Sequence, residues 1–238
     1  MEYKYIAIIL NKRDVGEMDR IYTLYSLEGG KIKSVAKSVR KPQAKLASSL
    51  ESITLADITI VRRRGLGKIT GSIVENNFTA IKGDEQALLS VFSVFHLFDR
   101  LVDFENPDRD VFLLLQKYLE SMDKSAQNGE TQKYFIFQYW FIVKLLDALG
   151  YAIGVDLCVS CGGRLSQSEI RFSSKQGGVL CEQCAKDDKE AIHISVNGVK
   201  MLRLFLKNDL RTFSKINASE SDCDSMRMAV DDFLRWNL

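Results

Sequence analysis

Between Tyr3 and Phe78 the hydrophobic positions alternate with polar ones in short runs, which is the two-residue period of β-strands. Five runs share this pattern, and they read YKYIAIIL, IYTLYSL, KIKSVA, ITLADITIV and KITGSIVENNF. The second and third runs are joined by Glu28-Gly29-Gly30, a link as short as a hairpin turn, whereas residues 37–49 are too polar and too numerous for a turn. Five short strands predict a small closed barrel, and the OB-fold is the usual five-stranded form. An SH3-like barrel is the alternative.

After Gly83 the hydrophobic period becomes helical. In DEQALLSVFSVFHLFDRLVDF the polar residues recur every three or four positions, as on one face of an amphipathic helix. A second helix is expected from Asp108 through Met122, because Pro107 and Asp108 restart the chain there. Further helices are expected over residues 130–149, 195–207 and 219–236, and the last two begin at serines that can cap free backbone N–H groups.

Four of the five cysteines form two CxxC pairs, LCVSCGG and LCEQC, with 19 residues between the pairs. This spacing is typical of a four-cysteine zinc site, because two intervening residues let both thiolates of a pair take adjacent corners of a tetrahedron. The predicted ligands are Cys158, Cys161, Cys181 and Cys184. Four thiolates leave no open coordination position, so one structural zinc ion per chain is expected. A thiol redox pair is the weaker alternative, since a redox CxxC normally opens a helix in a βαβ unit.

Together these patterns predict an α+β chain. A five-stranded OB-fold is expected over residues 1–80, and an α-helical domain over residues 81–238 with the zinc module inserted at about residues 155–190. His193 and Cys223 lie outside the ligand spacing, and His193 is expected to be the outward residue of a short strand.

The composition of the chain indicates the cellular compartment. The chain is 46% hydrophobic and 27% charged, as in a soluble protein with a sizeable core. Its most apolar stretch, from Tyr134, is interrupted by Gln138, Lys144 and Asp147, so no membrane association is expected. No secretory signal is evident at the start of the chain. Paired cysteines without an export signal indicate a reducing compartment, and we expect a cytoplasmic protein.

The charge is distributed unevenly. Residues 1–80 hold 14 Lys and Arg against 8 Asp and Glu, although the whole chain has a formal net charge of only +2. The sequence KIKSVAKSVRKPQAK, residues 31–45, carries six positive charges and no negative one, and we call it the basic segment. Its cations are Lys31, Lys33, Lys37, Arg40, Lys41 and Lys45. A second cluster is Arg62, Arg63 and Arg64. Such segments can be merely solvated, but on an OB-fold barrel they favour nucleic-acid binding.

Aromatic residues could assist that binding. Four tyrosines could stack on bases, although packing in the barrel is their more common role: Tyr3, Tyr5, Tyr22 and Tyr25.

The sequence shows no motif of a known catalytic site. Gly65, Gly67 and Gly71 do not have the spacing of a phosphate-binding loop, and the sequence contains no G-x-S-x-G elbow. We therefore expect a binding protein and no enzyme.

Several segments resemble the bacterial DNA repair protein RecO family. They are VGEMDRIYTLYSLEGGKIKSVAKSVRKPQAKLASSL, RRRGLGKITGSIVENNF, LLDALGYAIGVDLCVSCGGRL and FSSKQGGVLCEQC, in the family's order. One departure is Ala152-Ile153, where members commonly carry a proline, and about the last 40 residues show only general similarity.

The resemblance implies a recombination mediator without catalytic residues. Members bind single- and double-stranded DNA, anneal complementary strands, work with RecR, bind the C-terminal tail of single-stranded-DNA-binding protein, and help to load the recombinase on strands coated by that protein. The resemblance also implies that the basic segment contacts DNA. Arg62 to Arg64 are added to the expected DNA contacts from their charge alone. A zinc-containing RNA-binding protein with a basic barrel, or an enzyme acting on nucleic acid, are the alternatives.

Overall fold

The structure is a computed structural model that describes residues 1–165, 169–207 and 218–237. The chain divides into two compact units, Met1–Gln138 and Tyr139–Leu238, which are described separately. Within the described residues no helix is long and apolar enough to cross a membrane.

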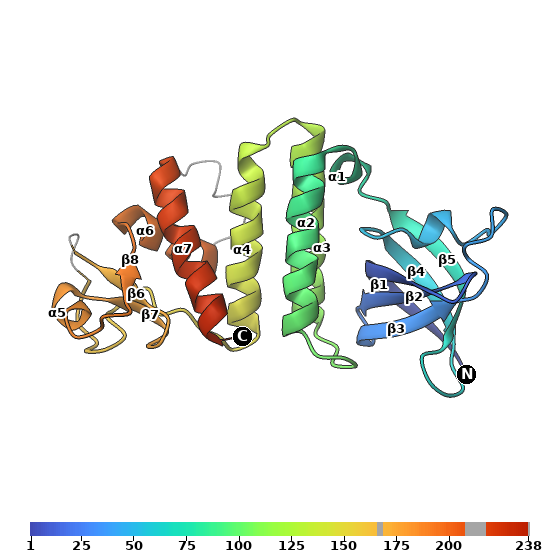
Figure 1. The fold of residues 1–238 in the computed structure, drawn as a ribbon, viewed down its shortest axis with the longest axis horizontal. Helices are drawn as coiled ribbons and strands as arrows, with labels where there is room; N and C mark the ends of the chain where they lie inside the picture. The colour runs from blue at the N-terminus through green and yellow to red at the C-terminus, as the bar shows by residue number, and fades with distance from the viewer. Residues whose placement is uncertain (166–168, 208–217, 238) are drawn as a thin grey trace. The chain divides into compact units, whose positions relative to one another are not determined.

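The first unit begins with five strands, as predicted (Figure 1). They are β1 (Glu2–Val15), β2 (Asp19–Ser26), β3 (Gly30–Ala36), β4 (Leu55–Val61) and β5 (Lys68–Asn76). Their order around the barrel is β1-β2-β3-β5-β4, and β1 also pairs with β4. All pairs are antiparallel except β3 with β5, which meet in parallel through the single pair Val35 and Lys68. This is the arrangement of an OB-fold, so the predicted fold is confirmed and the SH3-like alternative is not.

The barrel core explains the alternating sequence. Inward positions of all five strands are buried together, including Ile9, Leu24, Ile32, Ile58 and Ile69. A bulge between Ile9 and Asn11 lets the long β1 bend and pair with both neighbours. Outward positions stay available for other contacts.

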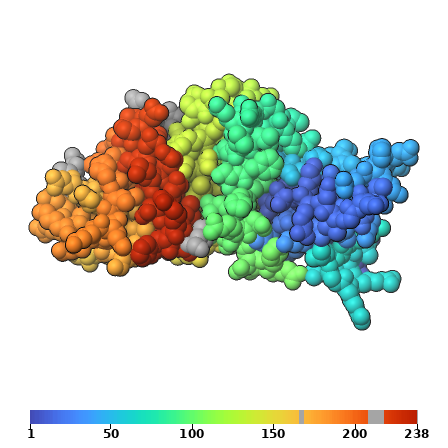
Figure 2. Space-filling view, viewed as in Figure 1, coloured from blue at the N-terminus to red at the C-terminus, as the bar shows by residue number. Residues whose placement is uncertain are grey.

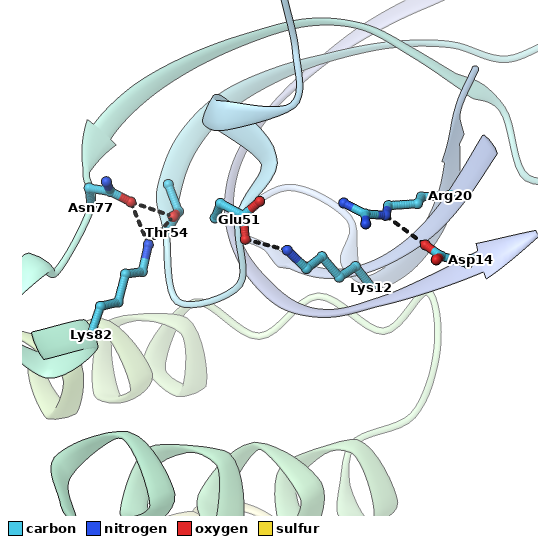
Figure 3. Close-up of polar contacts among 7 residues, drawn as sticks. All are labelled: Lys12, Asp14, Arg20, Glu51, Thr54, Asn77 and Lys82. Carbon is cyan, nitrogen blue, oxygen red and sulfur yellow. Dashed lines mark hydrogen bonds and ion pairs between the residues drawn. The ribbon is translucent and has the colours of Figure 1, made fainter. Parts of the chain in front are cut away.

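The β3–β4 connection, residues 37–54, closes one end of the barrel. It contains a short 3-10 helix, η1 (Ser48–Leu50), and it buries Val39 and Leu50 in the barrel core. Polar contacts fasten its far end (Figure 3): Glu51 pairs with Lys12 of β1, and the Lys82 ammonium donates to Thr54 Oγ1 at 3.0 Å. The connection is therefore anchored at its middle and its end.

Three helices belong to the same unit as the barrel: α1 (Thr79–Gly83), α2 (Glu85–Leu101) and α3 (Arg109–Gln127). The α2–α3 linker, residues 102–108, runs against β3. Gly30 has φ of +63°, and a Cβ there would lie 2.4 Å from the Asn106 carbonyl oxygen, so only glycine fits. The strands end at Asn76 and α1 begins at Thr79, and the compact unit that contains the barrel extends to Gln138.

Helix α4 (Gln132–Ala148) carries the chain into the second unit, where the described residues form a small sheet, one short helix and two longer helices. The sheet consists of β6 (Arg171–Ser173), β7 (Gly178–Leu180) and β8 (Ile192–His193), in the order β7-β6-β8. The helices are α5 (Glu182–Ala185), α6 (Val196–Lys207) and α7 (Glu220–Asn237). Ser195 Oγ accepts from Gly198 N at 2.9 Å and Ser219 Oγ accepts from Asp222 N at 3.2 Å, so both predicted serine caps are confirmed.

Candidate functional site

The two CxxC pairs come together in the second unit. The Sγ atoms of Cys158, Cys161, Cys181 and Cys184 all lie within 4.8 Å of one another. The distance between Cys161 Sγ and Cys181 Sγ is 3.9 Å. A tetrahedron with Zn–S bonds of about 2.3 Å has edges of about 3.8 Å, so this donor set fits such an ion.

The first pair sits on a tight turn. Cys158 N donates to Gly163 O and Gly162 N donates to Cys158 O, each at 2.9 Å. Gly162 has φ of +70°, a left-handed conformation that glycine adopts without strain. Burial raises the pKa of the Cys158 thiol, but hydrogen bonds from backbone N–H groups of both pairs outweigh it and lower that pKa to about 6. The turn therefore favours the thiolate, which is the form that binds metal.

The second pair follows a β-hairpin. Strands β6 and β7 are antiparallel, and Val159 N donates to Val179 O at 3.0 Å, which ties the first pair to β7. Cys181 then caps α5, where Ala185 N donates to Cys181 O at 2.9 Å. The hairpin thus returns Cys181 toward Cys158.

Neither His193 nor Cys223 joins the four-cysteine cluster. His193 is the exposed residue of β8, as predicted, and Cys223 lies on α7. Within the described residues this is the only group of three or more such side chains that could hold a metal ion. Four sulfur ligands would close the coordination sphere, which suits a structural role.

The cations of the basic segment fall into three classes. Lys37 Nζ lies 2.8 Å from Asp19 Oδ2, and Arg40 Nε lies 3.3 Å from Asp14 Oδ2. The hydrogen bond from Lys37 holds the pKa of Asp19 below its usual value. Lys41 and Lys45 are exposed and form no ion pair in the part of the chain that the structure describes. These two are the cations most available to an anionic partner.

Lys31 forms the third class and corrects our expectation that it contacts DNA. Its side chain is only 3% exposed, its Nζ lies 3.2 Å from Asp99 Oδ1, and it sits 4.3 Å from the centre of the Phe104 ring. The α2–α3 linker and the end of α2 therefore cover this ammonium. Lys33, which is exposed, lies 4.6 Å from the same ring.

The arginine cluster lies on the turn between β4 and β5, which Figure 2 shows as a turquoise projection from the barrel. Arg62 pairs with Glu105 at 2.9 Å, whereas Arg63 and Arg64 are exposed and unpaired within the described residues. The turn ends beside the start of the β3–β4 connection, because Val35 N donates to Gly67 O at 3.1 Å.

The tyrosines mostly pack. Tyr22 lies in the barrel core, and Tyr25 is buried against Phe98, with ring centres 4.8 Å apart. Tyr3 is 40% exposed and stacked on the partly buried Tyr5, so it keeps a ring at the surface.

Comparison with known proteins gives the family. The model described as Recombination protein O N terminal matches residues 1–78, and the model described as Recombination protein O C terminal matches residues 83–238. The chain belongs to the RecO family. DNA repair protein RecO of Dehalococcoides mccartyi strain 195 is 30% identical over all of this chain and 91% of its own length. The protein of the same name from Roseiflexus sp. strain RS-1 is 30% identical over 98% of this chain and 80% of its own length.

The curated relatives are DNA repair proteins, which agrees with the prediction that the barrel binds nucleic acid.

The barrel also carries two cations that the sequence analysis did not single out. Arg13 of β1 pairs in register with Ile21, which pairs with Val35, and Lys68 pairs with Val35 from the other side. Both are exposed. Their proximity to the basic segment depends on strand register, which charge counting along the sequence does not reveal.

Proposed function

We propose that this chain is a recombination mediator that binds single- and double-stranded DNA, anneals complementary strands, and helps to load the recombinase on strands coated by single-stranded-DNA-binding protein. Family membership over both halves of the chain carries this proposal. RecR and the C-terminal tail of single-stranded-DNA-binding protein are the proposed protein partners, and the recombinase is an indirect one. The work is done by binding, in the cytoplasm at the nucleoid.

The proposed DNA-contacting residues are exposed cations of the barrel on or near the basic segment and the β4–β5 turn. They are Lys33, Lys37, Arg40, Lys41 and Lys45, extended by Arg62, Arg63 and Arg64 and by Arg13 and Lys68. Lys31 is left out because its ammonium is buried against Asp99. Cations such as these displace counterions from phosphates and so bind DNA without reading its bases.

The proposed cofactor is one zinc ion per chain, held by Cys158, Cys161, Cys181 and Cys184. When bound, the ion would cross-link the first turn to the β6–β7 hairpin. Its contribution is to folding, because four thiolates leave no position for water or substrate.

The experiment is a strand-annealing assay with fluorescently labelled complementary DNA, both naked and precoated with single-stranded-DNA-binding protein from the same bacterium. We expect the protein to accelerate annealing of both, and Lys41→Ala/Lys45→Ala to lose much of the acceleration. The matched control is Lys189→Ala/Lys200→Ala, which removes two exposed lysines outside the barrel and should anneal like the parent.

Two results would count against the proposal. No acceleration with DNA would refute the mediator role. Faster annealing of complementary RNA than of DNA would instead favour the alternative, a zinc-containing RNA-binding protein.

A further inference from the structure

A cavity opens behind the unpaired lysines of the basic segment. Its volume is about 710 Å³, within the range of ligand sites, and it lies between the β1–β2 turn and the β3–β4 connection. Met18, Val39, Pro42 and Leu46 contribute apolar walls, while Lys41 and Lys45 stand among the lining residues.

The backbone holds the two sides of this cavity together. Arg40 N donates to Met18 O at 3.1 Å, and Ser38 N donates to Asp19 Oδ1 at 2.8 Å. Val39 is only 2% exposed and belongs to the barrel core, so the cavity wall continues into rigid structure. Met18, by contrast, is 43% exposed although it is apolar.

The chemistry of the lining restricts the occupant. Lysine ammonium groups border the cavity and no carboxylate is among its lining residues, so the complementary ligand is anionic. The apolar walls require that the ligand also carry an apolar or aromatic part. Methionine is well suited to an aromatic ring, because its sulfur is polarisable and its side chain adapts in shape.

We propose that this cavity takes one unpaired nucleobase of single-stranded DNA while the lysines at its edge hold the neighbouring phosphates. Single-stranded DNA places an aromatic ring next to each negative charge, whereas the bases of a duplex are stacked and paired and cannot enter. The cavity would therefore favour single strands over duplex. The inference rests on the proposed function, to which it adds a base-binding position.

The test compares an oligothymidylate with an abasic oligonucleotide of equal length, which has the same phosphates and no bases. Binding of each is measured by fluorescence anisotropy at several salt concentrations. A base held against apolar side chains should make the parent bind the oligothymidylate about tenfold more tightly than the abasic strand.

Two variants locate the effect. Met18→Ser removes an exposed apolar wall, and Ala44→Phe fills the cavity without changing its charge. Both should reduce the preference for the oligothymidylate to near onefold while leaving abasic binding and its salt dependence unchanged. In contrast, Lys41→Ala/Lys45→Ala should weaken binding of both strands by the same factor. Thermal unfolding of each variant shows that it is folded.

The outcomes separate the two proposals. If neither strand binds, the proposed function fails. If the parent binds both strands equally, or if both cavity variants keep the preference, the base-binding position is overturned while DNA binding through phosphates stands. A third outcome would assign the cavity to another ligand. In that outcome the parent binds both strands equally, and either anionic vesicles or an acidic peptide with an apolar end displaces the abasic strand.

Discussion

Replacing Lys41 and Lys45 with alanine should flatten the salt dependence of single-stranded DNA binding. Both side chains are exposed and form no ion pair within the described residues, so each can neutralise a phosphate without first leaving a carboxylate. Each neutralised phosphate of a single strand contributes roughly −0.7 to the slope of log K against log salt. Two lost contacts should therefore change the slope by about 1.4.

The slope sets the expected loss of affinity. Electrostatic contributions of this kind vanish near 1 M salt, so a slope change of about 1.4 corresponds to about 25-fold weaker binding at about 0.1 M salt. Stability should hardly change, because substitutions of exposed residues stay within about 0.5 kcal/mol. Anisotropy titrations between low and high salt measure the slope, and thermal unfolding measures the stability.

A charge-balanced variant provides the control. Lys37→Ala/Asp19→Asn removes an ion pair without changing the net charge, and asparagine keeps an acceptor for the Ser38 N–H group. The slope of log K against log salt should change by less than half as much in this control as in Lys41→Ala/Lys45→Ala. If Lys41→Ala/Lys45→Ala keeps both the affinity and the slope of the parent, the basic segment is only a solvated surface, and Arg63 and Arg64 are the next candidates.

Three further outcomes are expected. Purified protein should contain about one zinc ion per chain by elemental analysis. The Cys161→Ser variant should lose the ion and unfold at a lower temperature, whereas the control Cys223→Ser should keep the ion. Full zinc content in Cys161→Ser would contradict a four-cysteine site. Lys31→Ala should lower the free energy of unfolding by about 2 kcal/mol in urea titrations, because three buried methylenes are lost, whereas an equal effect in Lys33→Ala would mean that burial is not the cause. Hydrogen bonds from Ser195, Ser219 and Asn197 hold the pKa of Asp222 at about 2, below its usual 3.8, so the stability it contributes is present above about pH 4 and is lost as the pH falls toward 2. Asp222→Asn should therefore make the free energy of unfolding less dependent on pH in that window, and an unchanged pH dependence argues against this role.

The helices and strands and the set of four clustered cysteines could be predicted from the sequence. Alternating apolar residues mark the five strands because successive side chains of a strand face opposite sides, and helical periodicity marks α2 because residues three or four apart share a helix face. Turn chemistry is equally local: the serines before α6 and α7 cap them, and the CxxC spacing identifies the four cysteines. Each of these features depends on residues that are close together along the chain.

The contacts of each cation depend on segments that are distant in the sequence. Lys31 and Lys33 look alike in the sequence, yet the α2–α3 linker, some 70 residues further along, buries the first and leaves the second exposed. Lys37 and Lys41 also look alike, but only Lys37 reaches a carboxylate, Asp19 at the start of β2. Arg13 and Lys68 reach the basic segment through strand register. Charge along a sequence shows how many cations a segment holds, whereas burial and pairing depend on which distant segments pack against it.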